Sequence, residues 1–476
     1  MCATRSPQVL SLALAAAVLG CATEPGNLSP DVQLLLPLPG TSVRAGEIVE
    51  LAAEASDVDG TVQKVRFLVD GLAIGEDYAR PYETSWDTEG APLHSVISAV
   101  AYDDAGATGT DAVGVEVRWA YAPPPDIGDG WETGSLEDAN IDTEALERMV
   151  NALRDTVDHL VQGITLVRHG RLVFEVYFPG RGHPSQGEYP TAFGRETLHN
   201  LSSVTKSFTS TLLGIAIDRG LIDGVDQPVA DFFPEYGWLG VGDKANLTLE
   251  HFITMSSGLR WDQMTYPILD ARNDIAVFQR APDPWEEYLS RPLLTTPGSY
   301  FLYSEGSINI VGEVIRRASG QRLDVFAAEY LFRPLDVEQQ GWAVIRPELA
   351  FVWASGDLQL SPRSMAKLGQ LYLNGGRWSG RSVVSQAWLD AASAQRFSTE
   401  STRRTSWDRF GYGYAWWLAA GAWGEGAVAA AGWGHQWIVA MPEFDMVAAF
   451  TGGAYWETPP TTFHDLMIEH IRPAIR

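Results

Sequence analysis

The stretch from residue 199 to residue 217 contains almost no charged side chains. Its sequence is HNLSSVTKSFTSTLLGIAI, and Lys206 is the only fixed charge between Glu196 and Asp218. The residues after Lys206 are small or apolar on every side of a helical projection rather than along one stripe. This pattern predicts a helix that is buried over most of its circumference and carries one ammonium group near its start.

Residues 30–119 follow a second pattern, in which short runs of alternating apolar side chains are separated by turn residues. The turn residues are Pro39-Gly40, Asp59-Gly60, Asp70-Gly71, Glu89-Gly90 and Asp104-Ala105-Gly106. Short strands at this spacing predict an antiparallel β-sandwich of about 90 residues.

The region 141–476 shows both helical and strand periodicity. We predict one α+β domain here, with an antiparallel sheet built from the two ends of the region and a helical lobe inserted between them. The preceding residues 120–140 are rich in proline, glycine and acidic side chains, which predicts an interdomain linker. The elements behind this prediction are a helix over 142–159, a hairpin over 163–178, strands over 437–440 and 446–451, and a helix over 462–471.

The N-terminus carries a short apolar run, VLSLALAAAVLG, over residues 9–20. The run is too short to span a bilayer and predicts a secretory signal peptide over residues 1–20. It ends in Val18-Leu19-Gly20-Cys21, which resembles the lipobox of bacterial lipoproteins. We therefore expect a lipidated Cys21, a tether over residues 21–29, and a location in the cell envelope, at the outer membrane or a periplasmic face. A plain signal peptide followed by an incidental cysteine is the alternative.

Composition argues against several partners and cofactors. The formal net charge of −26 disfavours binding to nucleic acid or to an anionic membrane surface, so we expect membrane contact only through Cys21. Once Cys2 leaves with the signal peptide, Cys21 is the only cysteine, so we expect no disulfide and no cysteine-based metal site. The nine histidines are scattered, and no H-E-x-x-H, Walker or dinucleotide motif occurs. We predict no metal and no cofactor, and interpret Asp57, Asp59 and Asp104 as turn residues rather than calcium ligands.

Ser203 precedes Lys206 by three residues, so the two share a face of the predicted helix near its first turn. A serine hydroxyl is a poor nucleophile until a neighbouring base accepts its proton. A lysine whose pKa is lowered by burial can be that base or assist one. Free N–H groups and the positive dipole end at the first turn favour developing negative charge. Ser203 and Lys206 are therefore a candidate nucleophile and proton acceptor.

The same spacing recurs at Ser364 and Lys367. Ser361-Pro362 predicts an N-cap and the first residue of a helix there. The polar residues Arg363, Lys367 and Gln370 predict a solvated face, so we interpret this segment as a surface helix. The Ser-x-x-Lys spacing alone is therefore not specific. The apolar residues around Ser203 and Lys206 favour that pair as the functional one.

Two further segments carry residues that can complete such a site. A tyrosine beside an ammonium group can be stabilised as phenolate and act as a general base, which makes Tyr303 a candidate, although a single tyrosine is more often a core aromatic. The glycines of Gly432-Trp433-Gly434 allow a backbone N–H to approach a substrate oxyanion. For the following His435 we expect a structural or substrate-contacting role rather than acid–base chemistry.

These motifs together resemble those of the serine β-lactamase-like hydrolases. The order Ser203-Val204-Thr205-Lys206, Tyr303-Ser304-Glu305 and Gly432-Trp433-Gly434 is similar to the class C branch, with its esterases and 6-aminohexanoate-dimer-hydrolase-like members. The resemblance implies that Ser203 is acylated, that Lys206 is its proton partner, and that Tyr303 is the base that later activates water or another acceptor. It also implies an oxyanion hole formed by the Ser203 N–H and an N–H following Gly434.

The N-terminal region carries its own resemblance. The run DVDGTVQKVRFLVDGLAIGEDYARPYETSWDTEG, over residues 57–90, is similar to bacterial immunoglobulin-like domains. The resemblance implies a spacer or adhesion module that contacts a cell wall or surface.

The chain departs from the class C pattern at two positions. That branch has Tyr-x-Asn, where this chain has Glu305, and an ionised Glu305 would raise the pKa of Lys206 unless it turns away or is protonated. This shifts the role of base to Tyr303. The Lys-Thr-Gly motif is replaced by Gly432-Trp433-Gly434, which removes a cation that receives a substrate carboxylate. Both changes favour an ester or simple amide over a β-lactam or a D-Ala-D-Ala stem.

The sequence thus favours one function and leaves two others open. The favoured one is a secreted, lipid-anchored serine hydrolase that forms an acyl-enzyme on Ser203 with a small-molecule ester or amide. The alternatives are a β-lactamase or D,D-peptidase, and a catalytically silent surface-binding protein. For the favoured function, we expect Gly434, His435, Glu305 and Trp433 to bind the oxyanion or the substrate.

Overall fold

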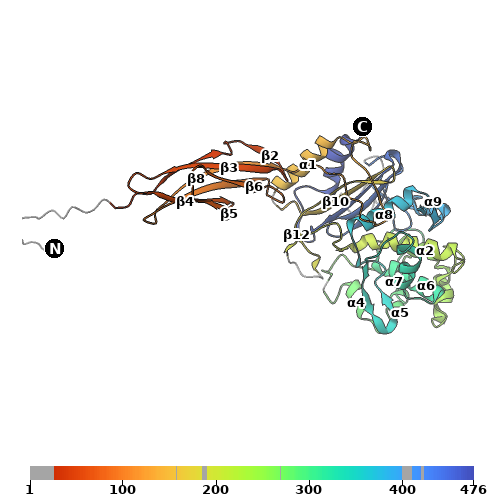
Figure 1. Cartoon of the computed structure of the whole chain (residues 1–476). Helices are drawn as coiled ribbons and strands as arrows, with labels where there is room; N and C mark the ends of the chain where they lie inside the picture. Colours follow the sequence, from red (N-terminus) through yellow and green to blue (C-terminus); the bar gives the residue numbers. More distant parts are fainter. Residues whose placement is uncertain (1–25, 157, 185–189, 269, 399–409, 420–422) are drawn as a thin grey trace, which may run out of the picture. The chain divides into compact units, whose positions relative to one another are not determined.

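The computed structural model describes residues 26–156, 158–184, 190–268, 270–398, 410–419 and 423–476 (Figure 1). The chain divides after Ala120 into two compact units. The predicted signal peptide and Cys21 lie outside the described residues. Along the described stretches, no helix combines the length and the apolar composition needed to cross a bilayer.

The first unit is a β-sandwich of two sheets around one core. The sheets have the strand orders β1-β3-β6 and β2-β8-β7-β4-β5. Side chains from both sheets, such as Leu51, Phe67 and Ile97, meet in a single buried cluster. This confirms the predicted immunoglobulin-like sandwich, although β2 pairs with β8 in parallel. The strands are β1 (Asp31–Leu36), β2 (Ser42–Arg44), β3 (Ile48–Ser56), β4 (Val62–Val69), β5 (Leu72–Asp77), β6 (Tyr82–Asp87), β7 (His94–Asp103) and β8 (Thr108–Arg118).

The second unit is built on a nine-stranded sheet of order β21-β22-β23-β24-β25-β26-β10-β11-β9. Strand β10 pairs with β26, so the two ends of the unit meet in the middle of the sheet, as predicted. The sheet is mixed rather than antiparallel, because β9 joins β11 in parallel. Its strands are β9 (Glu132–Thr133), β10 (Val161–Arg168), β11 (Arg171–Tyr177), β21 (Phe397–Ser398), β22 (Phe410–Tyr412), β23 (Trp417–Ala419), β24 (Val428–Gly432), β25 (Gln436–Met441) and β26 (Met446–Gly452).

Helices cover both faces of this sheet, which explains why β10 is buried at every position. On one face, Gly369 of α8 lies against Ile438 and Val447. On the other face, the ring of Phe463 in α10 lies 4.2 Å from that of Phe450. The helices on these faces are α1 (Thr143–Asp155), α8 (Pro362–Leu373), α10 (Phe463–Asp465), a π-helical turn (Leu466–Ile471) and α11 (Arg472–Ala474).

The middle of the unit forms the predicted helical lobe, which Figure 1 shows on the far side of α2 from the sheet. Helix α2 (Thr205–Asp218) is buried at every residue from Thr205 to Ala216, as its sequence predicts, and packs against α6 (Glu305–Ser319). The other helices of this part are α3 (Leu249–Ile253), α4 (Asp274–Arg280), α5 (Pro284–Leu289), α7 (Leu323–Ala327) and α9 (Gln386–Ala392). The short strands are β12 (Gly180–Arg181), β13 (Pro190–Thr191), β14 (His199–Asn200), β15 (Gly341–Trp342), β16 (Val344–Arg346), β17 (Phe351–Val352), β18 (Leu358–Leu360), β19 (Arg377–Trp378) and β20 (Arg381–Ser382).

The prediction that α8 has a solvated face is wrong. Ser361 caps the helix as expected, but Arg363, Lys367 and Gln370 are all at most 2% exposed. Arg363 donates hydrogen bonds to the carboxylate of Glu175. Lys367 Nζ donates to two backbone carbonyls. The error has a physical cause, because these partners come from distant parts of the chain and leave no mark on the local pattern.

The segment 120–140, which was expected to be a linker, helps to bury these side chains of α8. Trp131 Nε1 donates to the Arg363 carbonyl at 3.1 Å, and Lys367 donates to the carbonyl of Asp129. Tyr121 OH donates to the Val173 carbonyl on β11 at 2.8 Å. The residues after Ala120 therefore pack as part of the second unit.

Gly214 on helix α2 packs closely against α9, and this contact can be tested by mutation. A Cβ added at Gly214 would overlap with the indole ring of Trp388 on α9. We expect Gly214→Ala to destabilise the second unit by about 1–3 kcal/mol, because the overpacked core must shift. Thermal unfolding followed by circular dichroism measures the change. Gly237→Ala is the control, since a Cβ there meets nothing within 4 Å, and equal melting temperatures for the two variants would contradict the packing described.

Candidate active site

Ser203 lies in a turn that joins a short strand to a buried helix. Strand β14 leads into a 3₁₀ turn (Ser202–Val204), and α2 begins at Thr205. Ser202 adopts the left-handed region at φ 46°, which side-chain contacts hold in place. Asn200 Oδ1 accepts from Ser202 N at 2.9 Å, while Asn200 Nδ2 donates to Asp357 at 2.8 Å. The nucleophile candidate is therefore held on a rigid turn.

Lys206 points from the first turn of α2 into this site and is only 2% exposed. Its Nζ donates to Ser203 Oγ, Glu305 Oε1 and the Ser355 carbonyl, each at 2.7 Å. An ammonium group has three N–H donors and no acceptor. All three donors are therefore used, and one of them holds the Ser203 hydroxyl.

The charge state of Lys206 follows from these neighbours. Burial lowers the pKa of Lys206, but the negative charge of Glu305 and contact with Tyr303 raise it, and the net pKa lies above its ordinary value. Lys206 is therefore an ammonium ion at neutral pH, and the direction of this shift is the one expected from a neighbouring Glu305. In this form it orients and stabilises negative charge, but it cannot accept a proton from Ser203.

Tyr303 is the remaining group that can accept that proton. Lys206 Nζ lies 5.1 Å from the centroid of its ring, and both Lys206 and Ser203 are close enough to influence the pKa of its hydroxyl. Burial raises the pKa of Tyr303, the positive charge of Lys206 lowers it, and the net pKa is raised. The Tyr303 ring stacks on Trp417 at 6.2 Å with an interplanar angle of 19°, which fixes its orientation.

Glu305 is the first residue of α6, not part of a preceding turn. Ser304 caps the helix by accepting from Ser307 N, and Gln263 Oε1 accepts from Glu305 N at 2.9 Å. Asn309 Nδ2 donates to the carbonyl of Glu305 and to Ser355 Oγ, both at 2.9 Å. Glu305 is thus held toward Lys206, which excludes the alternative that it turns away.

The glycine segment lies directly against the nucleophile turn. A Cβ added at Gly432, the last residue of β24, would overlap with the Leu201 carbonyl and lie 3.1 Å from Ser203 N. Trp433 turns its ring toward other aromatics, 5.8 Å from His183 and 4.8 Å from Trp456. Gly432 is therefore the part of this segment that the contacts place against the backbone of Ser203.

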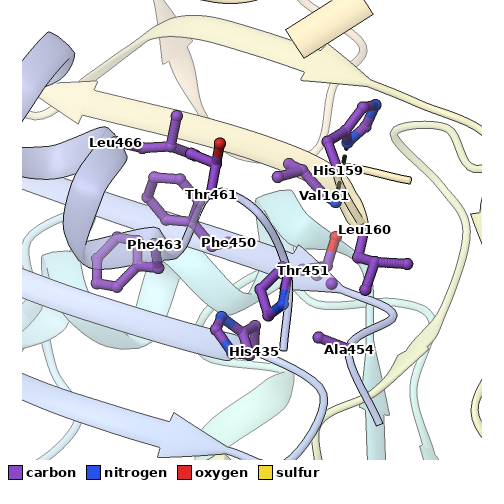
Figure 2. A pocket seen from close by; sticks show the side chains of 12 residues that line it. His159, Leu160, Val161, His435, Phe450, Thr451, Ala454, Thr461, Phe463 and Leu466 are labelled. Carbon is purple, nitrogen blue, oxygen red and sulfur yellow. Dashed lines mark hydrogen bonds between the residues drawn. The ribbon is translucent and has the colours of Figure 1, made fainter. Parts of the chain in front are cut away.

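The side chain of His435 lies elsewhere. Figure 2 shows it in a small pocket that is lined by His159, Thr451 and Phe463 and by none of Ser203, Lys206 and Tyr303. Its backbone has φ 66°. Burial lowers the pKa of His435, opposed by Asp465, so the ring is neutral at neutral pH. The His435 ring therefore lies among residues other than the nucleophile, the lysine and the tyrosine of the site.

Sequence reasoning missed three residues that complete the site. The Ser355 carbonyl binds Lys206, Gln263 fixes the start of α6, and Trp417 stacks on Tyr303. Ser355 and Trp417 belong to conspicuous sequence motifs, ASGDL and GYGYAWW, but nothing in those motifs indicates the contact. No group of three or more metal-ligating side chains that could hold an ion occurs in the part of the chain that the structure describes.

The assembled site can activate a serine for nucleophilic attack. Ser203 Oγ is oriented by an ammonium group, Tyr303 lies beside both groups, and Gly432 lies against the backbone of the Ser203 turn. This arrangement brings together a serine that can act as a nucleophile and a tyrosine that can act as its base.

Comparison with known proteins agrees with this geometry. The chain is 24% identical over 322 residues to 6-aminohexanoate-dimer hydrolase of Paenarthrobacter ureafaciens, covering 63% of this chain and 76% of that protein. It is 27% identical over 224 residues to esterase EstB of Burkholderia gladioli, covering 44% of this chain and 55% of that protein. The fold is similar to that of a putative 6-aminohexanoate-dimer hydrolase from Bacillus anthracis, with a TM-score of 0.53 at 20% identity over 67% of this chain and 79% of that one.

Two family matches define the organisation of the chain. Residues 30–115 match the bacterial Ig domain family, and residues 151–455 match the Beta-lactamase family. Because the second match spans more than half of the 476 residues, the chain belongs to the β-lactamase family of serine hydrolases and carries an N-terminal bacterial Ig domain.

Proposed function

We propose that this protein hydrolyses a small-molecule ester or simple amide through an acyl-enzyme on Ser203. The observation that carries the proposal is the 2.7 Å hydrogen bond from Lys206 Nζ to Ser203 Oγ inside a buried site that also contains Tyr303. A buried ammonium ion needs an acceptor for each of its N–H groups. Here one of those acceptors is a serine hydroxyl, and a nucleophilic serine needs a charged neighbour of this kind.

In the proposed acylation, Ser203 Oγ attacks the scissile carbonyl carbon while the Tyr303 phenolate takes the hydroxyl proton. The Lys206 ammonium stabilises the phenolate before the step and the serine oxygen during it. The Ser203 N–H and the N–H following Gly434 bind the oxyanion. Tyr303 then gives the proton to the leaving group as the carbon–leaving group bond breaks. Water, deprotonated by Tyr303, releases the acid in the second half-reaction.

The substrate class rests on the charged groups of the site. Glu305 already occupies Lys206, and Gly432-Trp433-Gly434 offers no side-chain cation to a substrate carboxylate. Two relatives carry the names of an esterase and a 6-aminohexanoate-dimer hydrolase, which is consistent with ester or linear amide substrates. A β-lactam or a D-Ala-D-Ala stem carries a carboxylate for which these groups provide no partner.

We propose a cell-envelope location for this activity. The apolar run over residues 9–20 followed by Cys21 supports export and lipid anchoring at the outer membrane or a periplasmic face. The Ig domain then acts as a spacer between the anchor and the hydrolase unit, with a cell wall or surface as its contact.

Ser203→Ala tests the proposed function directly. We expect the wild-type protein to hydrolyse p-nitrophenyl butyrate and to be labelled by a fluorophosphonate probe, and the variant to lose the label and about 10⁴-fold or more of the rate. Ser364→Ala, at the second Ser-x-x-Lys, is the matched control and should keep both. Unlabelled wild-type protein with a rate equal to that of Ser203→Ala would refute the proposal.

The raised pKa of Tyr303 predicts an alkaline profile. Because the phenolate is the reacting form and its pKa lies above the ordinary value, kcat/KM should rise about tenfold per pH unit between roughly pH 6 and pH 9. The rates are measured with p-nitrophenyl butyrate and corrected with Ser203→Ala at each pH. Tyr303→Phe should remove the rise, and a flat profile in the wild type would show that Tyr303 is not the titrating base.

Gly432→Ala tests the close approach of the glycine segment. The new Cβ would overlap with the Leu201 carbonyl beside Ser203, so the nucleophile turn and the oxyanion donors must separate. We expect kcat to fall about 10²–10³-fold, the loss typical of one oxyanion donor. Gly224→Ala, where a Cβ meets nothing within 4 Å, should keep full activity. Normal rates in Gly432→Ala would contradict the proposed oxyanion hole.

A further inference from the structure

The polar centre of the site contains a carboxylate that cancels its only described ammonium charge. Lys206 and Glu305 form an ion pair at 2.7 Å, with exposed fractions of 2% and 9%. A lone ammonium beside the nucleophile would attract an anionic substrate. The pair has no net charge, so this attraction is lost.

Glu305 has one carboxylate oxygen that can still accept a hydrogen bond. Its Oε1 accepts from Lys206, its backbone N donates to Gln263, and its carbonyl accepts from Asn309. Among the described residues, no hydrogen bond uses Oε2, which is also absent from the fully buried polar atoms that lack a partner. A carboxylate oxygen accepts hydrogen bonds and cannot donate them. Oε2 is thus an anionic acceptor that is not fully buried and has no hydrogen-bond partner among the described residues.

A second carboxylate is bound to the nucleophile turn through Asn200. Asp357 accepts from Asn200, whose side chain holds Ser202 N, and its charge acts on the ring of His183. Burial lowers the pKa of His183, so this histidine is neutral at neutral pH. Lys206, Glu305 and Asp357 together therefore carry one net negative charge around Ser203.

Aromatic rings of the site add to this preference for a cation. Trp417 is partly buried and stacks on Tyr303, whose ring already lies 5.1 Å from the Lys206 ammonium. The faces of tryptophan and tyrosine attract ammonium groups. The net charge of −26 for the whole chain adds a long-range attraction of the same sign.

We propose that Glu305 determines substrate charge, and that the site selects esters or amides carrying an ammonium group near the scissile carbonyl over those carrying a carboxylate. The proposal rests on the proposed acyl-enzyme function and names the substrate class of that same site. The cation binds Glu305 Oε2, with Asp357 and the aromatic faces as further attraction, while a carboxylate is repelled by both acids.

The test uses three p-nitrophenyl esters with acyl chains of equal length that end in a methyl group, a trimethylammonium group or a carboxylate. The quaternary ammonium avoids self-cleavage by a free amine. The kcat/KM of each charged ester is first divided by that of the neutral ester. The quantity compared between variants is the ratio of the cationic value to the anionic value. The variants are Glu305→Gln, which keeps the shape of the side chain, and Glu286→Gln, which removes one exposed carboxylate on α5.

We expect the wild-type ratio to exceed about 10, because one charge at close range in a partly buried site changes an affinity by about that factor. Glu305→Gln should lower the ratio about tenfold, and Glu286→Gln should leave it unchanged. A wild-type ratio of one or less would overturn the inference without any variant. A ratio that survives in a folded, active Glu305→Gln protein would also overturn it.

The outcomes separate this inference from the function on which it rests. Ser203-dependent hydrolysis of the neutral ester with an unselective ratio would overturn the inference alone. Absence of Ser203-dependent hydrolysis of all three esters would overturn the proposed function, and the inference with it.

Discussion

The second unit depends on the solvation of one buried ammonium ion. An uncompensated charge at the position of Lys206 would cost several kcal/mol, so each of its three N–H groups needs an acceptor. The acceptors come from the turn before α2, from the first residue of α6 and from the segment before β18. These three segments are therefore held at one point, and the same hydrogen bonds that satisfy the ion also orient Ser203.

The secondary structure positions this point between the sheet and the helical lobe. Helix α2 is apolar on all sides because it is packed on all sides, and the β24–β25 turn brings the sheet to the end of α2 at Gly432. Asn309, one turn into α6, ties the carbonyl of Glu305 to Ser355 Oγ. The site thus belongs to no single element, and its precision comes from hydrogen bonds between elements.

Local pattern predicted those parts of the structure whose cause is local. The burial of α2, the cap at Ser361 and the hairpin of β10 and β11 follow from residues within a few positions of one another. Residue chemistry made Tyr303 and the glycine segment candidates, but only the family resemblance placed them with Ser203, because no local rule brings together residues a hundred or more positions apart. Ser355 and Gln263 were missed for the same reason, since a backbone carbonyl and an amide leave no signature of a site.

The two Ser-x-x-Lys segments show where the reasoning from sequence was incomplete. Apolar context was used to prefer Lys206, yet Lys367 is buried as well, and burial lowers its pKa to about 8. The difference lies in the partners. Lys367 binds only backbone carbonyls, and Ser364 bonds with Ser361. Lys206 instead binds a serine hydroxyl and a carboxylate. Burial identifies a lysine that needs partners, but only the identity of those partners separates a structural lysine from a chemical one.

Glu305 has one effect that favours the proposed chemistry and one that hinders it. Its charge keeps Lys206 protonated, so the ammonium ion stays bound to Ser203 through the pH range in which an isolated buried lysine would lose its proton. The same charge raises the pKa of Tyr303, which makes the phenolate scarcer at neutral pH and more basic when it forms. An asparagine at this position would relieve both effects, and the ammonium would then be free to bind a substrate carboxylate. The Glu305 carboxylate therefore lowers the fraction of Tyr303 phenolate at neutral pH. It also holds the Lys206 ammonium in place and supplies an anionic acceptor for the substrate.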